Sequence, residues 1–160
     1  MKDIGSLAGR ETVCILTDMG QPVGRNVGNS LEIIESIECL KGNMPEDIEE
    51  IILELGSYMI KLAGYGDDLK ENKEKILEAI QSGKALNKFI KLVEAQDGDG
   101  DYIKDTNKFE QAKYILPVVS SSNGYVKMLD GEKVGQVSVN LGGGRIKKED
   151  DIDHAVRNSI

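Results

Sequence analysis

The stretch TDMGQPVGRNVGNSLE, residues 17–32, has the residue types best suited to bind a small charged ligand. It places a glycine-rich loop between an apolar run and an amphipathic segment, which is the general arrangement of a phosphate-binding loop. It lacks the GxxxxGK[ST] spacing, in which a lysine and a hydroxyl contact the phosphates. The stretch by itself therefore does not predict a phosphate site.

A hard cation is the second ligand that this stretch could bind. The loop at 20–28 offers backbone carbonyl oxygens, and three acidic residues surround it: Asp18, Glu32 and Glu35. Carbonyl and carboxylate oxygens are the ligands that hard cations prefer. Glu35 lies three residues after Glu32, on the polar side of a predicted helix, so a solvated helix face explains the same carboxylates without any ligand. The cation site and the solvated helix face are both inferred from residue spacing alone.

Three other features suggest chemistry, and each has a plainer explanation. DGDGD at 97–101 could begin an EF-hand calcium loop, but positions six and twelve hold Tyr102 and Lys108 where glycine and glutamate are required. A solvated acidic loop is favoured instead. LGGGR at 141–145 lacks phosphate-loop spacing and predicts a tight turn. His154 is the single histidine, which excludes a multi-histidine metal site, and no cysteine or serine lies in a nucleophile motif.

Composition narrows the class of protein. The sequence has 20 Lys+Arg and 28 Asp+Glu, a net charge of −8, and such a surface repels nucleic acids and anionic membranes. The longest apolar runs are a few residues, and charges in MKDIGSLAGRE occupy the place of a signal peptide's apolar stretch. Cys14 and Cys39 are isolated thiols, typical of a reducing compartment. We therefore expect a soluble, acidic, cytoplasmic chain.

Hydrophobic periodicity predicts the elements that hold these residues. TVCILT, residues 12–17, is typical of a short strand buried on both faces of a parallel sheet. Asn29 as N-cap and Glu32 form a capping box that begins a helix, which Gly42 ends. Apolar stripes with glycine stops predict three more helices, at Pro45 to Gly64, Asp68 to Gln81 and Ala85 to Ala95.

After residue 100 the pattern changes to short β-prone runs with turn signals, in YILPVVSSSNGYVKMLDGEKVGQVSVNLGGGR. The best turn signals are SNG at 122–124 and DG at 130–131, and a short final helix is predicted at 148–156. The predicted fold class is an α/β fragment: a short parallel-sheet strand followed by four helices, then a small, incomplete α+β module.

Several blocks of the sequence resemble the pyrimidine-nucleoside phosphorylase and thymidine phosphorylase family. They are TDMGQPVGRNVGNSLEIIESIECLKG, PEDIEEIILELGSYMIKLAG and SGKALNKFIKLVEAQDGD, while GYVKMLDGEKVGQVSVNLGGGRIKKEDDIDHAV resembles the start of the family's C-terminal domain. The resemblance covers nearly all of residues 3–156, the middle to C-terminal portion of the family's sequence. It implies that 1–105 form part of the large α/β domain, a strand plus a helical subregion. It implies equally that 106–160 form the beginning of the β-rich C-terminal domain, truncated.

The resemblance implies a pentosyltransferase of pyrimidine salvage, which cleaves a pyrimidine nucleoside with phosphate to the free base and a pentose 1-phosphate. Family members are homodimers with the active site between a small helical and a large α/β domain. The family's phosphate-binding glycine/serine/lysine motif and the Arg…Ser…Lys set that grips the base lie upstream of the block at residue 17. The resemblance therefore assigns no catalytic or substrate-binding residue to this chain, and the chain alone is expected to be inactive.

One ligand set of the family does map onto this sequence. Some members bind a monovalent, potassium-like cation near the phosphate through two loop carbonyls and a helix carboxylate. By the resemblance these ligands are the backbone carbonyls of Val23 and Asn26 and the carboxylate of Glu35. The remaining ligands would come from the upstream phosphate loop, and no organic cofactor is implied. The alternative function is a non-enzymatic helical interaction module, or a split-gene product that needs an N-terminal partner and self-associates without it.

Overall fold

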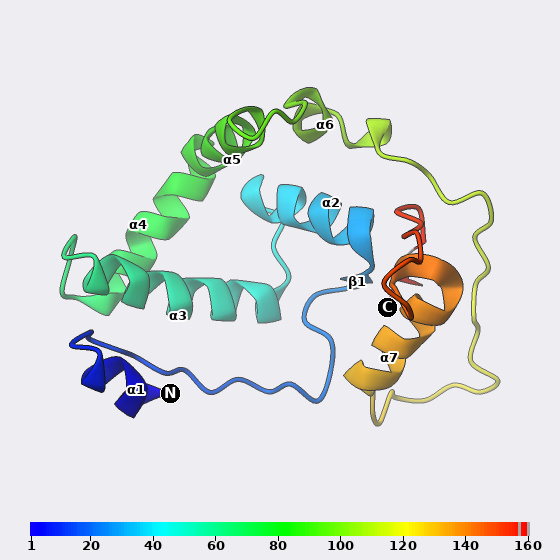
Figure 1. The fold of residues 1–160 in the computed structure, drawn as a ribbon, viewed down its shortest axis with the longest axis horizontal. Coiled ribbons are helices and arrows are strands. Elements are labelled where there is room, and N and C mark those ends of the chain that lie inside the picture. The colour runs from blue at the N-terminus through cyan, green and yellow to red at the C-terminus, as the bar shows by residue number, and fades with distance from the viewer. Residues whose placement is uncertain (157, 160) are drawn as a thin grey trace.

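The computed structural model describes residues 1–156 and 158–159, which form an elongated, mainly helical molecule (Figure 1). The helices are α1 (Lys2–Leu7), α2 (Asn29–Leu40), α3 (Glu46–Leu62), α4 (Leu69–Gln81), α5 (Lys84–Glu94), α6 (Asp101–Lys104) and α7 (Gly131–Ser138). A 3-10 turn, η1 (Thr106–Lys108), and a π-helical turn, η2 (Val139–Gly143), follow α6 and α7, and the strands are β1 (Asn26–Val27) and β2 (Asn158–Ser159). In Figure 1, α2 lies above α3. From the end of α3, α4 rises toward α5, which lies at the top of the view.

The four predicted helices are confirmed as α2 to α5, and their ends follow the expected capping chemistry. After α2 the chain turns at Gly42, whose φ of 96° lies in the left-handed region, and the Asn43 N–H donates to the Glu38 carbonyl at 2.9 Å. The Asp68 side chain caps α4 by accepting from the N–H groups of Lys70 and Glu71.

The predicted N-cap of α2 is displaced by one residue. Gly28 is the N-cap, and its N–H donates to Glu32 Oε1 at 2.8 Å. Glu32 thus bonds back to the N-cap, as in a capping box, but from the fourth helical residue instead of the third. Asn29 is already helical, and its side-chain amide donates to the carbonyl of Gly143 at 3.0 Å. The Asn29 side chain, which the local pattern predicted as the cap, thus bonds to the distant backbone carbonyl of Gly143 instead.

The pairing of α3 with α4 forms the most closely packed part of the described chain. Gly56 lets the two helices approach, because a Cβ there would lie 2.7 Å from Ile76 Cδ1. Ser57 and Asn72 are fully buried, and the Asn72 amide donates to the carbonyls of Ser57 and Gly66 at 3.2 and 2.9 Å. A buried amide with partners on both sides fixes the α3–α4 turn.

The predicted parallel strand at 12–17 is wrong for this structure. These residues are extended but belong to no sheet, and the strands of the described residues are β1 and β2, an antiparallel pair with Asn26 opposite Ser159. An extended run becomes a strand only when a neighbour takes its backbone hydrogen bonds. No neighbouring strand lies beside 12–17 within the described part of the chain, and Leu16 is consequently 98 % exposed.

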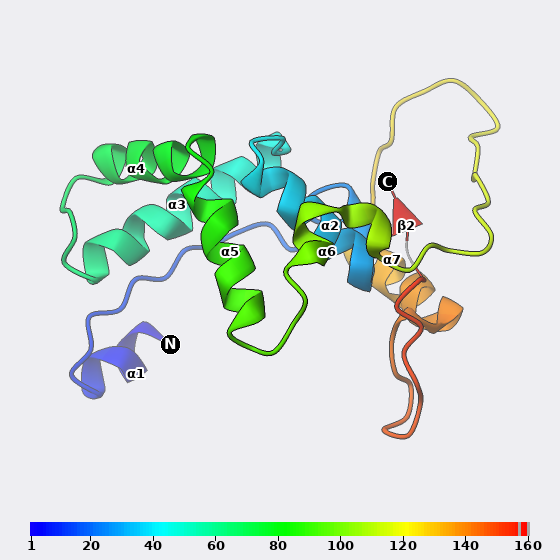
Figure 2. The ribbon, with the colours of Figure 1, turned by 90° about the horizontal axis from the view of Figure 1, so that it is seen from above.

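After residue 106, where the sequence predicts a β-rich module, the regular elements of the described residues are η1, α7, η2 and the short strand β2. Residues 112–130 have no regular secondary structure and form a long loop that extends away from the helices (Figure 2). The DG signal at 130–131 begins α7, because the Asp130 side chain accepts from the Lys133 N–H as an N-cap. The predicted helix at 148–156 is a series of turns over the described residues there.

Among the described residues, none of the helices is both long enough and apolar enough to cross a membrane.

Candidate functional site

The loop at 23–26 is held between α2 and α3 by two carboxylates. Glu35, on α2, accepts through Oε1 from the Arg25 N–H at 3.0 Å and from the Asn26 side-chain amide at 3.1 Å. Asp47, in the first turn of α3, accepts from the Gly24 N–H at 2.7 Å. Three successive loop residues are thus fixed by acceptors that come from two helices.

Gly24 is required at its position by both its conformation and its surroundings. Its φ is 75°, and a Cβ there would lie 2.6 Å from Glu35 Oε2 and 2.7 Å from Ile48 Cδ1. The Glu35 carboxylate therefore lies directly against the loop backbone, which a side chain at residue 24 would push away.

The structure brings the three residues of the expected cation site into one small region. Val23, Asn26 and Glu35 all line the same cavity, with Val23 exposed and Glu35 half-buried. Glu35 Oε1 already accepts two hydrogen bonds, whereas Oε2 has no hydrogen bond within the described residues. One carboxylate oxygen beside a loop backbone suits a hard cation with oxygen ligands. No cluster of three or more His, Cys, Asp or Glu side chains fit to hold a metal occurs in the described residues.

The cavity beside the loop, about 560 Å³, is mainly apolar. Its walls come from the loop and from α2, α3, α4 and α5, with contributions from Leu40, Ile48 and Phe89. Cys39 also lines it; burial, followed by the charge of Glu35, raises the pKa of this thiol, so it stays protonated near neutral pH. Among the described residues that line the cavity, no hydrogen bond pairs the side chain of a nucleophile with that of a base.

The remaining candidates of the sequence have structural roles. The loop at 141–145 lies against the N-terminus of α2 through the Asn29–Gly143 bond, and Gly142 has a φ of 103°, as a tight turn requires. The backbone carbonyl of His154 accepts from Ser30 Oγ at 2.8 Å, while its side chain is exposed. In the acidic loop at 97–101, Asp101 pairs with lysines of α6 and η1, which lowers the pKa of its carboxyl.

Asp47 is the site residue that the sequence did not indicate. It lies 23 residues after Gly24, and its type fits an ordinary first-turn acid that favours a helix N-terminus. Only the tertiary packing of α3 against the loop gives it the second role of anchoring Gly24.

The sequence of this chain is similar to known proteins of one family. Residues 125–156 match the family described as "Pyrimidine nucleoside phosphorylase C-terminal domain". The chain is 44% identical over 156 residues to proteins named pyrimidine-nucleoside phosphorylase from Staphylococcus aureus, for example in strains USA300 and COL. The match covers 98% of this chain and 36% of each relative.

These comparisons confirm the resemblance to pyrimidine-nucleoside phosphorylases, and they place the end of the match in the C-terminal domain. The chain spans about a third of the length of the curated relatives that it matches. The chain is therefore similar to proteins named pyrimidine-nucleoside phosphorylase, and its residues 125–156 are similar to the C-terminal domain of that family.

Proposed function

We propose that this chain is the part of a pyrimidine-nucleoside phosphorylase that holds the cation side of the active site. The full enzyme transfers the pentosyl group of a pyrimidine nucleoside to phosphate, and acts as a cytoplasmic homodimer in pyrimidine salvage. The observation that carries the proposal is the 44% identity over 98% of the chain, a length that includes the loop at 23–26 and its anchors. The fixed loop geometry supports it, because positioned polar groups are what an electrostatic mechanism of phosphorolysis needs.

A chimera tests the proposed activity. The matched segment of the Staphylococcus aureus phosphorylase is replaced by this chain, and release of free base from uridine or thymidine is measured with and without phosphate. Phosphate-dependent release well above that of the relative lacking the segment supports the proposal. A folded chimera without any phosphorolysis of either nucleoside contradicts it.

The isolated chain is the negative control for this assay. The resemblance places the phosphate- and base-binding motifs outside these 160 residues, so the chain alone is expected to release no base. Turnover above the blank would show that this chain has its own catalytic groups.

The proposed cofactor is a monovalent, potassium-like cation, bound by the backbone carbonyls of Val23 and Asn26 and by Glu35 Oε2. Its support is the single carboxylate oxygen of Glu35 that has no hydrogen bond in the described chain and lies against the loop at Gly24. In the chimera, Glu35→Gln should raise the potassium concentration for half-maximal activity by about tenfold, because a charged ligand becomes neutral.

The control for this substitution is Glu38→Gln, the same change one turn further along α2. Glu38 pairs with Lys41 at 2.8 Å and makes no hydrogen bond to the loop at 23–26 among the described residues. It should leave the potassium dependence unchanged. Equal potassium dependence in Glu35→Gln and wild type would refute the cation site while leaving the proposed activity intact.

A further inference from the structure

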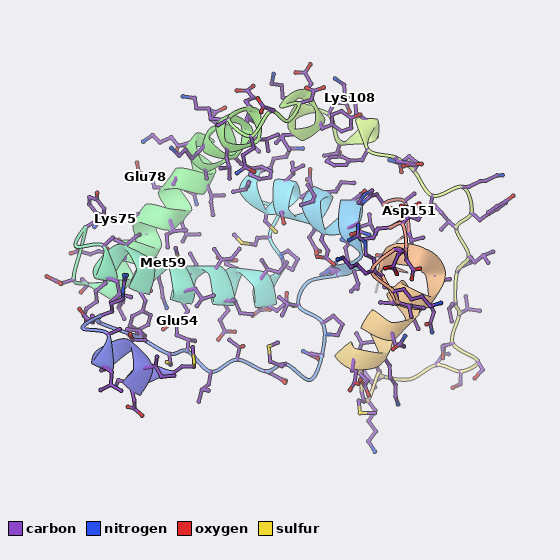
Figure 3. All side chains as sticks on the ribbon, viewed as in Figure 1. Glu54, Met59, Lys75, Glu78, Lys108 and Asp151 are labelled. Carbon is purple, nitrogen blue, oxygen red and sulfur yellow. The ribbon has the colours of Figure 1, made fainter. Side chains whose placement is uncertain are left out.

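The turn signal SNG at 122–124 lies in the exposed loop at 112–130, where it joins no pair of strands and begins no helix. In Figure 3 this loop continues from the labelled Lys108 and forms the edge of the molecule, with no other element on its outer side. Val119 and Val126, on either side of the signal, are both 82% exposed. The tertiary structure therefore places few constraints on the backbone at 122–124.

Asn123 differs chemically from the other asparagines of the chain because glycine follows it. Each of the others precedes a residue that has a side chain. The backbone nitrogen after an asparagine can attack the carbonyl carbon of the asparagine side chain and close a five-membered ring. A Cβ on the following residue hinders this attack, and glycine has none. The sequence thus contains a single asparagine at which the ring closure is unhindered.

The structure leaves both reacting groups of this pair free. Within the described residues, neither the Asn123 side-chain amide nor the Gly124 N–H takes part in a hydrogen bond. Ser120 Oγ donates to the Ser122 carbonyl at 2.7 Å, so this local bond ends one residue before Asn123. A Cβ built at Gly124 would meet no atom within 4 Å. The backbone can therefore bring the Gly124 nitrogen against the Asn123 side chain without losing a native contact.

Asp130 and Gly131 form the same kind of pair, but hydrogen bonds fix both of its groups. The Gly131 N–H donates to the Gly20 carbonyl at 3.1 Å. The Asp130 side chain accepts from the Lys133 N–H at 3.1 Å, as the N-cap of α7. A ring closure there would break both bonds, whereas at Asn123 it breaks none.

We propose that Asn123 is a site of spontaneous deamidation. The deprotonated backbone nitrogen of Gly124 attacks Asn123 Cγ. As the new N–C bond closes a succinimide ring, the C–N bond of the side-chain amide breaks and ammonia leaves with the proton. Water then adds to one of the two ring carbonyls, and the bond from that carbonyl to the ring nitrogen breaks. Opening at Cγ gives aspartate, and opening at the backbone carbonyl gives isoaspartate.

The modification changes the connection between the helices and the C-terminal segment. Each event adds a negative charge to a chain whose net charge is −8. In the isoaspartate form the backbone runs through the former side chain and is longer by one carbon atom, within the loop that links η1 to α7. Water is the only co-reactant, and the reaction uses no residue of the candidate site. The proposal therefore goes beyond the proposed function and does not depend on it.

The test is incubation of the purified chain at neutral and at mildly alkaline pH, followed by tryptic digestion and mass spectrometry. Trypsin cleaves after Lys113 and Lys127, so the peptide 114–127 reports on Asn123. We expect this peptide to separate with time into amide, aspartate and isoaspartate forms, faster at the higher pH because the attack needs a deprotonated nitrogen. Asn87, exposed on α5 and followed by Lys88, is the internal control and should remain an amide. Conversion of Asn123 no faster than that of Asn87 would overturn the proposal.

Gly124→Ala is the decisive variant, because its Cβ enters open space and leaves the fold unchanged. It should slow the conversion of Asn123 by at least about fivefold, which is about 1 kcal/mol in the barrier, the order of the conformational freedom that glycine has over alanine. Gly135→Ala, in α7, is the matched control, since a Cβ there also meets no atom within 4 Å. It should convert at the wild-type rate, and circular dichroism checks that both variants keep their helices. Equally fast conversion in Gly124→Ala and wild type would also overturn the proposal.

Discussion

Asn72→Ala, on α4, should lower the free energy of unfolding substantially. The Asn72 side chain is fully buried, and its amide donates to the carbonyls of Ser57 and Gly66, while Lys75 Nζ donates to its Oδ1 at 3.2 Å. The truncation leaves the Gly66 carbonyl without its donor, removes a second bond to Ser57 and opens a small void. Each effect costs about 1 kcal/mol, so the free energy of unfolding should fall by about 2–3 kcal/mol.

The measurement is urea denaturation at neutral pH followed by far-ultraviolet circular dichroism. Asn87→Ala is the control, because Asn87 is exposed on α5 and its side chain makes no hydrogen bond within the described chain. It should change stability by no more than about 0.5 kcal/mol, since alanine favours a helix. Asn72→Asp, which keeps the size but turns a donor into an acceptor, should be at least as destabilising as Asn72→Ala. A loss below about 0.5 kcal/mol for Asn72→Ala would refute the assigned role of this amide.

Three further predictions follow from the same structure. Gly24→Ala should lower the unfolding free energy by about 1–2 kcal/mol and release the loop, seen as faster hydrogen exchange at Arg25, because a left-handed conformation and a blocked Cβ coincide. Backbone hydrogen bonds lower the pKa of Asp68, so its contribution is present above the ordinary pKa of 3.8 and is lost as pH falls through the lowered value. In Asp68→Asn the free energy of unfolding, measured with urea, should therefore fall less over this acid range than in wild type. An equal fall in both proteins would contradict the role of Asp68 as N-cap. Of the two thiols, exposed Cys14 should react with a disulfide reagent at neutral pH, and buried Cys39 only after denaturation.

The helices could be predicted from the sequence because their signals are local. The stripe of α3 and the cap at Asp68 lie within one or two turns of the backbone that they organise. The prediction of a strand at 12–17 was wrong because a strand needs a neighbouring strand, and a local sequence pattern does not show whether one is present. The turn signal at 130–131 begins a helix instead, because an aspartate that precedes a glycine can also serve as a helix N-cap, as Asp130 does.

The candidate site was only partly predictable for the same reason. Glu35 lies on the same short stretch as the loop, and its position on the polar side of α2 could be inferred from spacing. Asp47 could not, because its contact with Gly24 arises only when α3 folds back toward the loop. The alternative use of the Asn29 side chain, by Gly143, spans 114 residues and has no sequence signal.

The contacts of the C-terminal segment with α2 join parts of the chain that are far apart in the sequence. The α3–α4 pair closes within a few dozen residues, whereas the Asn29–Gly143 and Ser30–His154 bonds close loops of 114 and 124 residues. Long loops close slowly and at higher entropic cost, so we expect these bonds to form late in folding. We expect these bonds also to open early, and a protease that cuts the exposed loop at 112–130 should leave α2 to α5 folded.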